Sequence, residues 1–252
     1  MKTMRKNNGF TLVELSIVLV IVGLLIGGLL VGQSLMDSAK LNSQVKQLEQ
    51  YDIATTNFRQ KYKQWPGDST YFPHSTGYTT GNGDGFINDH GGNNPPQSLL
   101  DEPARFFNHL YLSGNLKEDH SSAYSPIGKG SMPELKIAKG RGMTVTMTGK
   151  GELYYFLGIY EIIGGSMAYY QMSPSGIMTA STAMAIDAKL DDGIPNKGNI
   201  LATQQYPQGP TSAIPHALDT AANGCTTSGT AYNLANSSDT ACRLTVKSNV
   251  SK

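Results

Sequence analysis

The chain has 252 residues, of which 39% are hydrophobic and 15% charged, and its formal net charge at pH 7 is +1. This length allows one membrane-spanning helix and one globular domain of ordinary size. A charge so close to zero gives no field that would gather a nucleic acid, so we expect no nucleic-acid partner.

The chain begins with a short basic leader, residues 1–9, and an almost unbroken apolar run follows over residues 15–31. Extended slightly at both ends, this run reaches the ~20 residues that cross a bilayer. The basic leader predicts a cytoplasmic N-terminus, which places the rest of the chain outside the cytoplasm. Glu14 stands at the head of the apolar segment. An acidic side chain there is costly without a partner, which marks it as a functional residue.

Gly9, Phe10 and Glu14 belong to the run Gly-Phe-Thr-Leu-Val-Glu, which resembles the processing site of type IV prepilins and of type II secretion pseudopilins. The resemblance implies that a prepilin peptidase cuts after Gly9 and that Phe10 becomes the methylated N-terminus. It also implies that Glu14 pairs with the N-terminal amine of a neighbouring subunit in a filament. Because Gly9 precedes the apolar run, the order of segments differs from a secretory signal peptide. An ordinary single-pass anchor is the alternative.

These features divide the chain into a leader (residues 1–9), a transmembrane and filament-core helix (10–36) and a globular domain in the periplasm or outside the cell (37–252). Apolar residues recur at spacings of three and four from Leu41 to Tyr62, and Trp65-Pro66-Gly67 ends the pattern. We therefore predict one continuous helix over about residues 11–64, apolar all round in its first half and with one stripe to bury in its second.

Residues 81–89 read Gly-Asn-Gly-Asp-Gly-Phe-Ile-Asn-Asp, and we call residues 81–87 the Asn-Asp loop. Alternating Asn and Asp before a glycine are typical of a calcium-binding loop, although the first and twelfth ligand positions of that pattern do not match. The alternative is a glycine-rich turn whose Asn and Asp favour left-handed backbone. The candidate Ca²⁺ ligands are Asn82, Asp84, Asp89 and Glu102, with Asp68 and Asp101 as further nearby carboxylates.

Further along, the pattern predicts a short helix over residues 103–112, in which His109 is a packed or hydrogen-bonded residue rather than a metal ligand. Strands are predicted at 144–148, 153–163 and 167–172. Laid on the second half of the long helix, they would form a small antiparallel sheet, so the expected fold class is α+β, pilin-like, with extended loops.

A second helix is predicted over residues 177–190, ending in an acidic group. Asp187 and Asp191 would share one helix face, with Asp192 beside them. Such a group can bind a cation, but the sequence favours a solvated helix end.

Cys225 and Cys242 are expected to pair, because the domain lies outside the cytoplasm. Type IV pilins carry a C-terminal disulfide loop that many type II pseudopilins lack, so the resemblance favours a pilus subunit. The calcium-like loop favours the secretion system instead. The sequence holds no nucleophile elbow, phosphate-binding loop or metalloprotease motif, so we predict no enzyme.

The sequence thus predicts a structural subunit of a type IV pilus or related filament that polymerises with pilins of the same or another kind. It would begin as a single-pass precursor in the bacterial inner membrane and end in a pilus or pseudopilus, in the periplasm or at the cell surface. The alternatives are a type II secretion pseudopilin and a minor tip subunit that acts as a calcium-dependent adhesive module.

Overall fold

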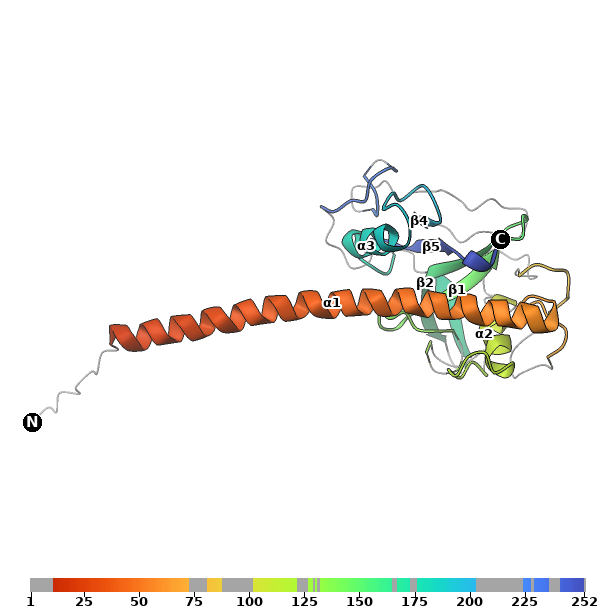
Figure 1. The fold of residues 1–252 in the computed structure, drawn as a ribbon, viewed down its shortest axis with the longest axis horizontal. Helices are drawn as coiled ribbons and strands as arrows, with labels where there is room; N and C mark the ends of the chain where they lie inside the picture. The colour runs from red at the N-terminus through yellow and green to blue at the C-terminus, as the bar shows by residue number, and fades with distance from the viewer. Residues whose placement is uncertain are drawn as a thin grey trace, which may run out of the picture. The chain divides into compact units, whose positions relative to one another are not determined.

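The computed structural model describes residues 11–72, 81–87, 102–121, 127–128, 130, 132–164, 167–172, 176–202, 224–227, 229–235 and 241–251. The chain divides into two compact units, Met1–Lys40 and Leu41–Lys252. One helix, α1 (Leu12–Tyr62), contributes to both units (Figure 1).

α1 begins and ends where local chemistry requires it. The Thr11 hydroxyl accepts a hydrogen bond from the Glu14 amide (3.2 Å), while the Glu14 carboxylate accepts one from the Thr11 amide (2.8 Å). This reciprocal pair is a capping box. The helix ends at Tyr62, because Lys63 adopts a left-handed conformation (φ 58°) and Pro66 follows. The predicted helix over about 11–64 is confirmed.

Within the second unit, one face of α1 forms part of the core. The predicted stripe is confirmed, since Val45, Leu48, Tyr51, Thr55 and Phe58 are buried. Two buried glutamines flank it: the Gln44 side chain accepts from the Lys136 amide (2.8 Å), and the Gln47 side chain donates to the Glu134 carbonyl (3.0 Å). These amides satisfy backbone groups of a connection that would otherwise lie against the helix unpaired.

The sheet is antiparallel, with strand order β1-β2-β5-β4. Its centre is β2 (Leu153–Gly164), which pairs with β1 (Arg141–Met147) along one edge. Along the other edge β2 pairs first with β5 (Leu244–Lys247) and then with β3 (Met167–Met172). The three predicted strands are confirmed. β4 (Ile200–Ala202) and β5 were not predicted, because three or four residues are too few for a period-two pattern.

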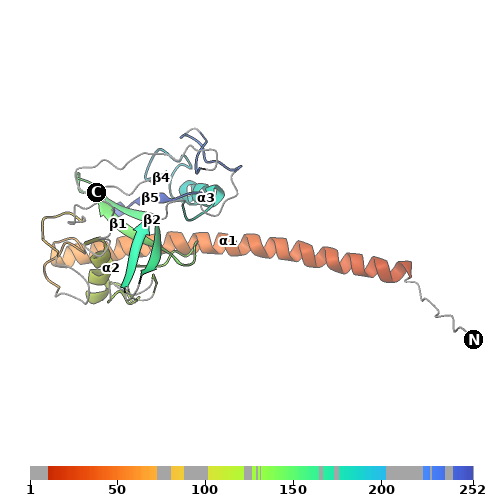
Figure 2. The ribbon, with the colours of Figure 1, turned by 180° about the vertical axis from the view of Figure 1, so that it is seen from behind.

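Two shorter helices complete the unit: α2 (Glu102–Leu112) and α3 (Ala180–Leu190). α2 supplies Phe106, Phe107 and Leu110 to the core beside the C-terminal end of α1 (Figure 2). α3 starts three residues later than predicted, because Met178 forms a β-bridge with Cys242 and Thr179 caps the helix by accepting from the Thr182 amide. A long helix packed on a small antiparallel sheet confirms the α+β class.

The C-terminal segment, with the 3₁₀ turn η1 (Asn249–Ser251), is tied to α1 by one carboxylate. Asp52 accepts hydrogen bonds from the Tyr155 hydroxyl (2.8 Å), the Ser248 hydroxyl (2.5 Å) and the Asn249 amide (3.1 Å). Tyr155 is buried, so its hydroxyl depends on this acceptor. The contact joins α1, β2 and the end of the chain at one point.

Replacing Asp52 by asparagine should lower the free energy of unfolding of the domain by about 1–3 kcal/mol, because charge-assisted hydrogen bonds are lost at a buried tyrosine. Urea denaturation of residues 37–252 measures this difference. Glu49→Gln, one turn earlier and exposed, is the matched control and should leave the midpoint unchanged. Equal midpoints for all three proteins would contradict the assigned role of Asp52.

Candidate functional site

Of the residues expected to act in processing and assembly, the structure describes Glu14, whereas Gly9 and Phe10 lie outside the described residues. Glu14 Oε2 accepts hydrogen bonds from both the amide (2.8 Å) and the hydroxyl (2.9 Å) of Thr11. Sequence reasoning missed Thr11, although the spacing Thr-x-x-Glu before an apolar run is the signal of a capping box. Within one chain, therefore, the Glu14 carboxylate already caps its own helix.

The first half of α1 exposes a continuous apolar surface. The large apolar side chains from Leu12 to Val31 have exposed fractions between 43% and 87%. α1 is long and apolar enough to cross a membrane. Exposed leucine, isoleucine and valine over this length would be strongly unfavourable in water, so this surface must lie in lipid or against other protein.

The Asn-Asp loop folds back on the turn that ends α1. The Asp68 carbonyl accepts from the Gly83 amide (3.1 Å), and Asp68 Oδ2 accepts from the Gly85 amide (3.0 Å). A Cβ on Gly81 would lie 2.4 Å from the Asp68 carbonyl oxygen, so only glycine fits there. The loop is thus held by backbone contacts as well as by its side chains.

The structure brings three of the candidate calcium ligands to this loop, while Asp89 lies outside the described residues. Asn82 and Asp84 bond to each other, Nδ2 donating to Oδ2 at 2.8 Å, and Glu102 Oε1 accepts from the Asn82 amide (3.1 Å). Asp84 also accepts from the Phe86 amide (2.8 Å). These bonds are those of a turn closed by Asn and Asp side chains.

Asp68 is the candidate ligand that has a carboxylate oxygen available to accept a further contact. It is 1% exposed, and its Oδ1 has no hydrogen-bond partner among the described residues. Burial raises the pKa of its carboxyl above the ordinary value, and the charge of Asp84 raises it further. Ionised Asp68 is therefore costly unless a proton or a cation lies at Oδ1.

His109 on α2 is confirmed as a packed residue. Its Nδ1 accepts a hydrogen bond from the Gly67 amide (2.9 Å), and its ring stacks on Phe58. Burial and the charge of Arg105 lower the pKa of His109 to about 3. Because Nδ1 is occupied as an acceptor, the folded state requires the neutral imidazole.

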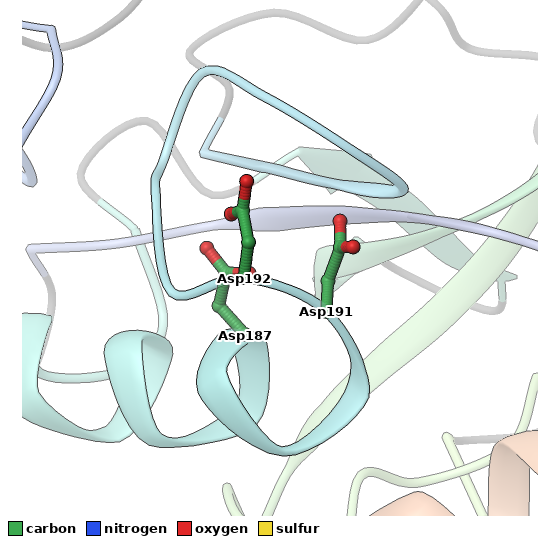
Figure 3. Close-up of side chains that lie close together, drawn as sticks. All are labelled: Asp187, Asp191 and Asp192. Carbon is green, nitrogen blue, oxygen red and sulfur yellow. The ribbon is translucent and has the colours of Figure 1, made fainter.

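A second acidic group follows α3, and here the prediction of a solvated helix end is wrong for Asp187. Asp187, Asp191 and Asp192 form a group in which carboxylate oxygens lie within 4.8 Å of one another (Figure 3). Asp187 is fully buried. The Tyr232 hydroxyl (2.7 Å) and the Gly193 amide (3.1 Å) donate hydrogen bonds to its two oxygens, which compensates for the loss of water. In the described part of the chain, the carboxylates at the Asn-Asp loop do not form such a group.

Cys225 and Cys242 form the predicted disulfide, with a Cα–Cα distance of 4.8 Å. Both residues are buried in the core. The bond closes a loop that contains Tyr232, so the same loop that donates to Asp187 is fixed covalently beside β5. This arrangement anchors the C-terminal region to α3.

Comparison with protein families identifies one match. Residues 4–30 match the prokaryotic N-terminal methylation motif, which is the signature of type IV pilins and pseudopilins. Comparisons with curated proteins and with solved structures gave no significant match. The motif and the apolar helix fit a membrane-anchored precursor and a structural, pilin-like protein.

The neutral state of His109 predicts a pH dependence of stability. Its pKa is about 3 in the folded state and ordinarily near 6.5 in an unfolded chain. The stabilisation is therefore complete above about pH 6.5 and falls as the pH decreases toward 3, because the unfolded chain binds the proton first. From pH 7 to 4.5 the loss should be about 2.5 kcal/mol.

Urea denaturation of wild type and His109→Gln at these two pH values isolates the contribution of this residue. Glutamine offers an acceptor for the Gly67 amide but does not titrate. The stability difference between the two proteins should shrink on acidification, and a difference independent of pH would contradict the assignment.

Proposed function

We propose that this chain is a subunit of a type IV pilus. The prepilin peptidase would cut after Gly9, Phe10 would be methylated, and the mature chain would polymerise through α1. The observation that carries this proposal is the methylation motif leading directly into an exposed apolar helix. That surface is suited to lipid before assembly and to neighbouring helices after it.

Glu14 has a defined part in the proposed assembly. Within one chain its carboxylate binds the amide and hydroxyl of Thr11. In the filament it would also meet the amine of Phe10 on a neighbouring subunit, which neutralises both charges in a medium of low dielectric constant. This pairing would set the register between subunits.

The disulfide between Cys225 and Cys242 favours a pilus over a type II secretion pseudopilus. The bond fixes the C-terminal loop beside the sheet. Such a bond persists in an oxidising environment and stabilises a domain that would be exposed outside the cell. A pseudopilin remains the alternative within the same class, because it shares the motif and the helix.

A second candidate function is a calcium-dependent binding module displayed at the filament tip. The observation that favours it is Asp68 Oδ1, which is buried beside Asp84 and has no hydrogen-bond partner within the described part of the chain. A Ca²⁺ ion at this oxygen would compensate for the buried negative charge. The ion would then hold the Asn-Asp loop rigid for a ligand.

Calorimetric titration of residues 37–252 with CaCl₂ tests the calcium site. We expect saturable heat with a Kd of about 10⁻⁴–10⁻³ M, the range of extracellular calcium modules. Asp68→Asn should abolish the heat, whereas Asp119→Asn, an exposed aspartate elsewhere, should retain it. No heat from wild type at millimolar calcium would exclude the site.

The charge of Glu14 is tested by filament yield in cells that assemble the wild-type protein. Glu14→Gln keeps an acceptor for Thr11 but loses the charge, while Glu14→Ala loses both. Both variants should be cleaved normally, yet should lower the yield of sheared filaments about tenfold or more, because the neighbour's amine is left unpaired.

Immunoblots for precursor and mature chain control for expression and cleavage. If Glu14→Gln gave wild-type yield while Glu14→Ala did not, the role of Glu14 would be the helix cap and not the charge pair.

A further inference from the structure

An open groove of about 490 Å³ lies at the C-terminal end of α1, where the 3₁₀ turn η1 meets the helix. The described residues that line it are Thr56, Arg59, Gln60, Lys63, Asn249 and Val250. The charged residues among them are Arg59 and Lys63, so the described lining is cationic. We call this the basic groove.

The two cationic side chains of the basic groove differ in how firmly the structure fixes them. Arg59 Nη1 donates to the Val250 carbonyl (3.0 Å), and the guanidinium lies 3.7 Å from the centre of the Trp65 ring. These contacts fix its position. Lys63 is exposed just beyond the helix. Asp52, two turns earlier on α1, is occupied by Tyr155 and the C-terminal segment and is not among the lining residues.

Charge of the opposite sign lies at the other end of the same unit. Asp192 is exposed and Asp191 partly exposed just after α3 (Figure 3), and we call this pair the acidic corner. Lys189 Nζ donates to Asn42 Oδ1 (2.6 Å), which places the end of α3 beside residue 42 of α1. The same end of α3 also lies beside Leu48 and Asp52, where Leu190 lines a small cavity with them. The basic groove, around residue 60, therefore lies about 12–27 Å further along the helix at 1.5 Å per residue.

Figures 1 and 2 show the same order from opposite sides, with α3 toward the N-terminal part of this unit and the end of α1 at its far side. This separation exceeds the Debye length of about 8–10 Å at ordinary salt, so the two charges compensate each other little within one chain. A second copy displaced along α1 would bring them together. Contacts between two different patches of identical subunits are those that build helical filaments.

We propose that the basic groove of one subunit receives the acidic corner of a second copy of this chain. This contact rests on the proposed function and adds a head-to-tail pairing between globular domains to the packing of the N-terminal helices. Lys63 pairs with Asp192, and Arg59 supports it from its fixed position over Trp65. The pairing sets the axial register of the domains, because the two opposite charges meet at one displacement of the subunits and not at others.

Charge reversal at either side tests this contact in cells that assemble wild-type filaments. Lys63→Glu and Asp192→Lys should each lower the yield of sheared filaments about tenfold, since attraction becomes repulsion at every repeat. The double variant Lys63→Glu/Asp192→Lys should recover to within about threefold of wild type, because the pair is restored with opposite signs.

The chain offers matched controls. Lys61→Glu makes the same charge change on the last turn of α1, outside the groove lining. Asp119→Lys removes an exposed carboxylate that accepts from the amide two residues on at 2.8 Å, as Asp192 does. Both controls should assemble like wild type.

Zero-length carbodiimide crosslinking of wild-type filaments gives an independent readout. The reagent joins only groups in direct contact, and Lys63 lies about 16 Å or more along α1 from the end of α3. A crosslinked peptide containing both Lys63 and Asp192 would therefore join two subunits. Wild-type yield from both single variants, or a double variant no better than the singles, would overturn the pairing while leaving the pilus proposal intact. A wild-type chain that forms no filaments would overturn the pilus proposal and the pairing with it.

Discussion

One helix in this protein must satisfy two environments. The N-terminal part of α1 exposes large apolar side chains over its whole circumference, whereas the part beyond Leu41 buries a single stripe against a sheet and a second helix. Apolar surface that is exposed in one chain has to be covered by lipid or by other chains. The proposed membrane anchoring and polymerisation follow from this division, because it separates a segment that needs partners from a domain that buries its own part of the helix.

Buried polar contacts as well as apolar packing hold the domain on its part of α1. Asp52 accepts hydrogen bonds from the Tyr155 hydroxyl and from the C-terminal segment, and Gln47 donates one to a carbonyl of the connection before β1. At the end of the helix, Gly67 donates to His109 and Asp68 accepts from the Asn-Asp loop. Such contacts have directional requirements that apolar packing lacks. They fix the domain in one orientation on its part of the helix, as the proposed repetition of the subunit along a filament would require.

The sequence was most informative where the physics is local or periodic. The apolar run, the stripe from Val45 to Phe58 and the strand within residues 153–163 could all be recognised from spacing alone. The disulfide followed from the expected compartment. β4 and β5 could not be predicted, because their short segments become strands only by pairing with a partner distant in the chain. Burial of Asp187 was equally inaccessible, since its Tyr232 partner lies 45 residues away.

The candidate sites divide in the same way. Glu14 could be recognised from sequence because its position in an apolar helix is itself unusual. The interest of Asp68 became visible only in the structure, because burial of its Oδ1 without a hydrogen-bond partner among the described residues is a property of packing. The basic groove also required the structure, since it joins α1 to a turn nearly 200 residues later in the chain. Long-range contacts of this kind leave no periodic signal in one sequence.

The proposal that this chain is a processed filament subunit is tested by the mass and N-terminal sequence of the protein purified from membranes and from sheared filaments. We expect a chain that begins at methylated Phe10, lacks residues 1–9 and has Cys225 joined to Cys242. If every chain in both fractions still began at Met1 with an unmodified Phe10, processing would be ruled out, and the apolar helix would then be a simple membrane anchor.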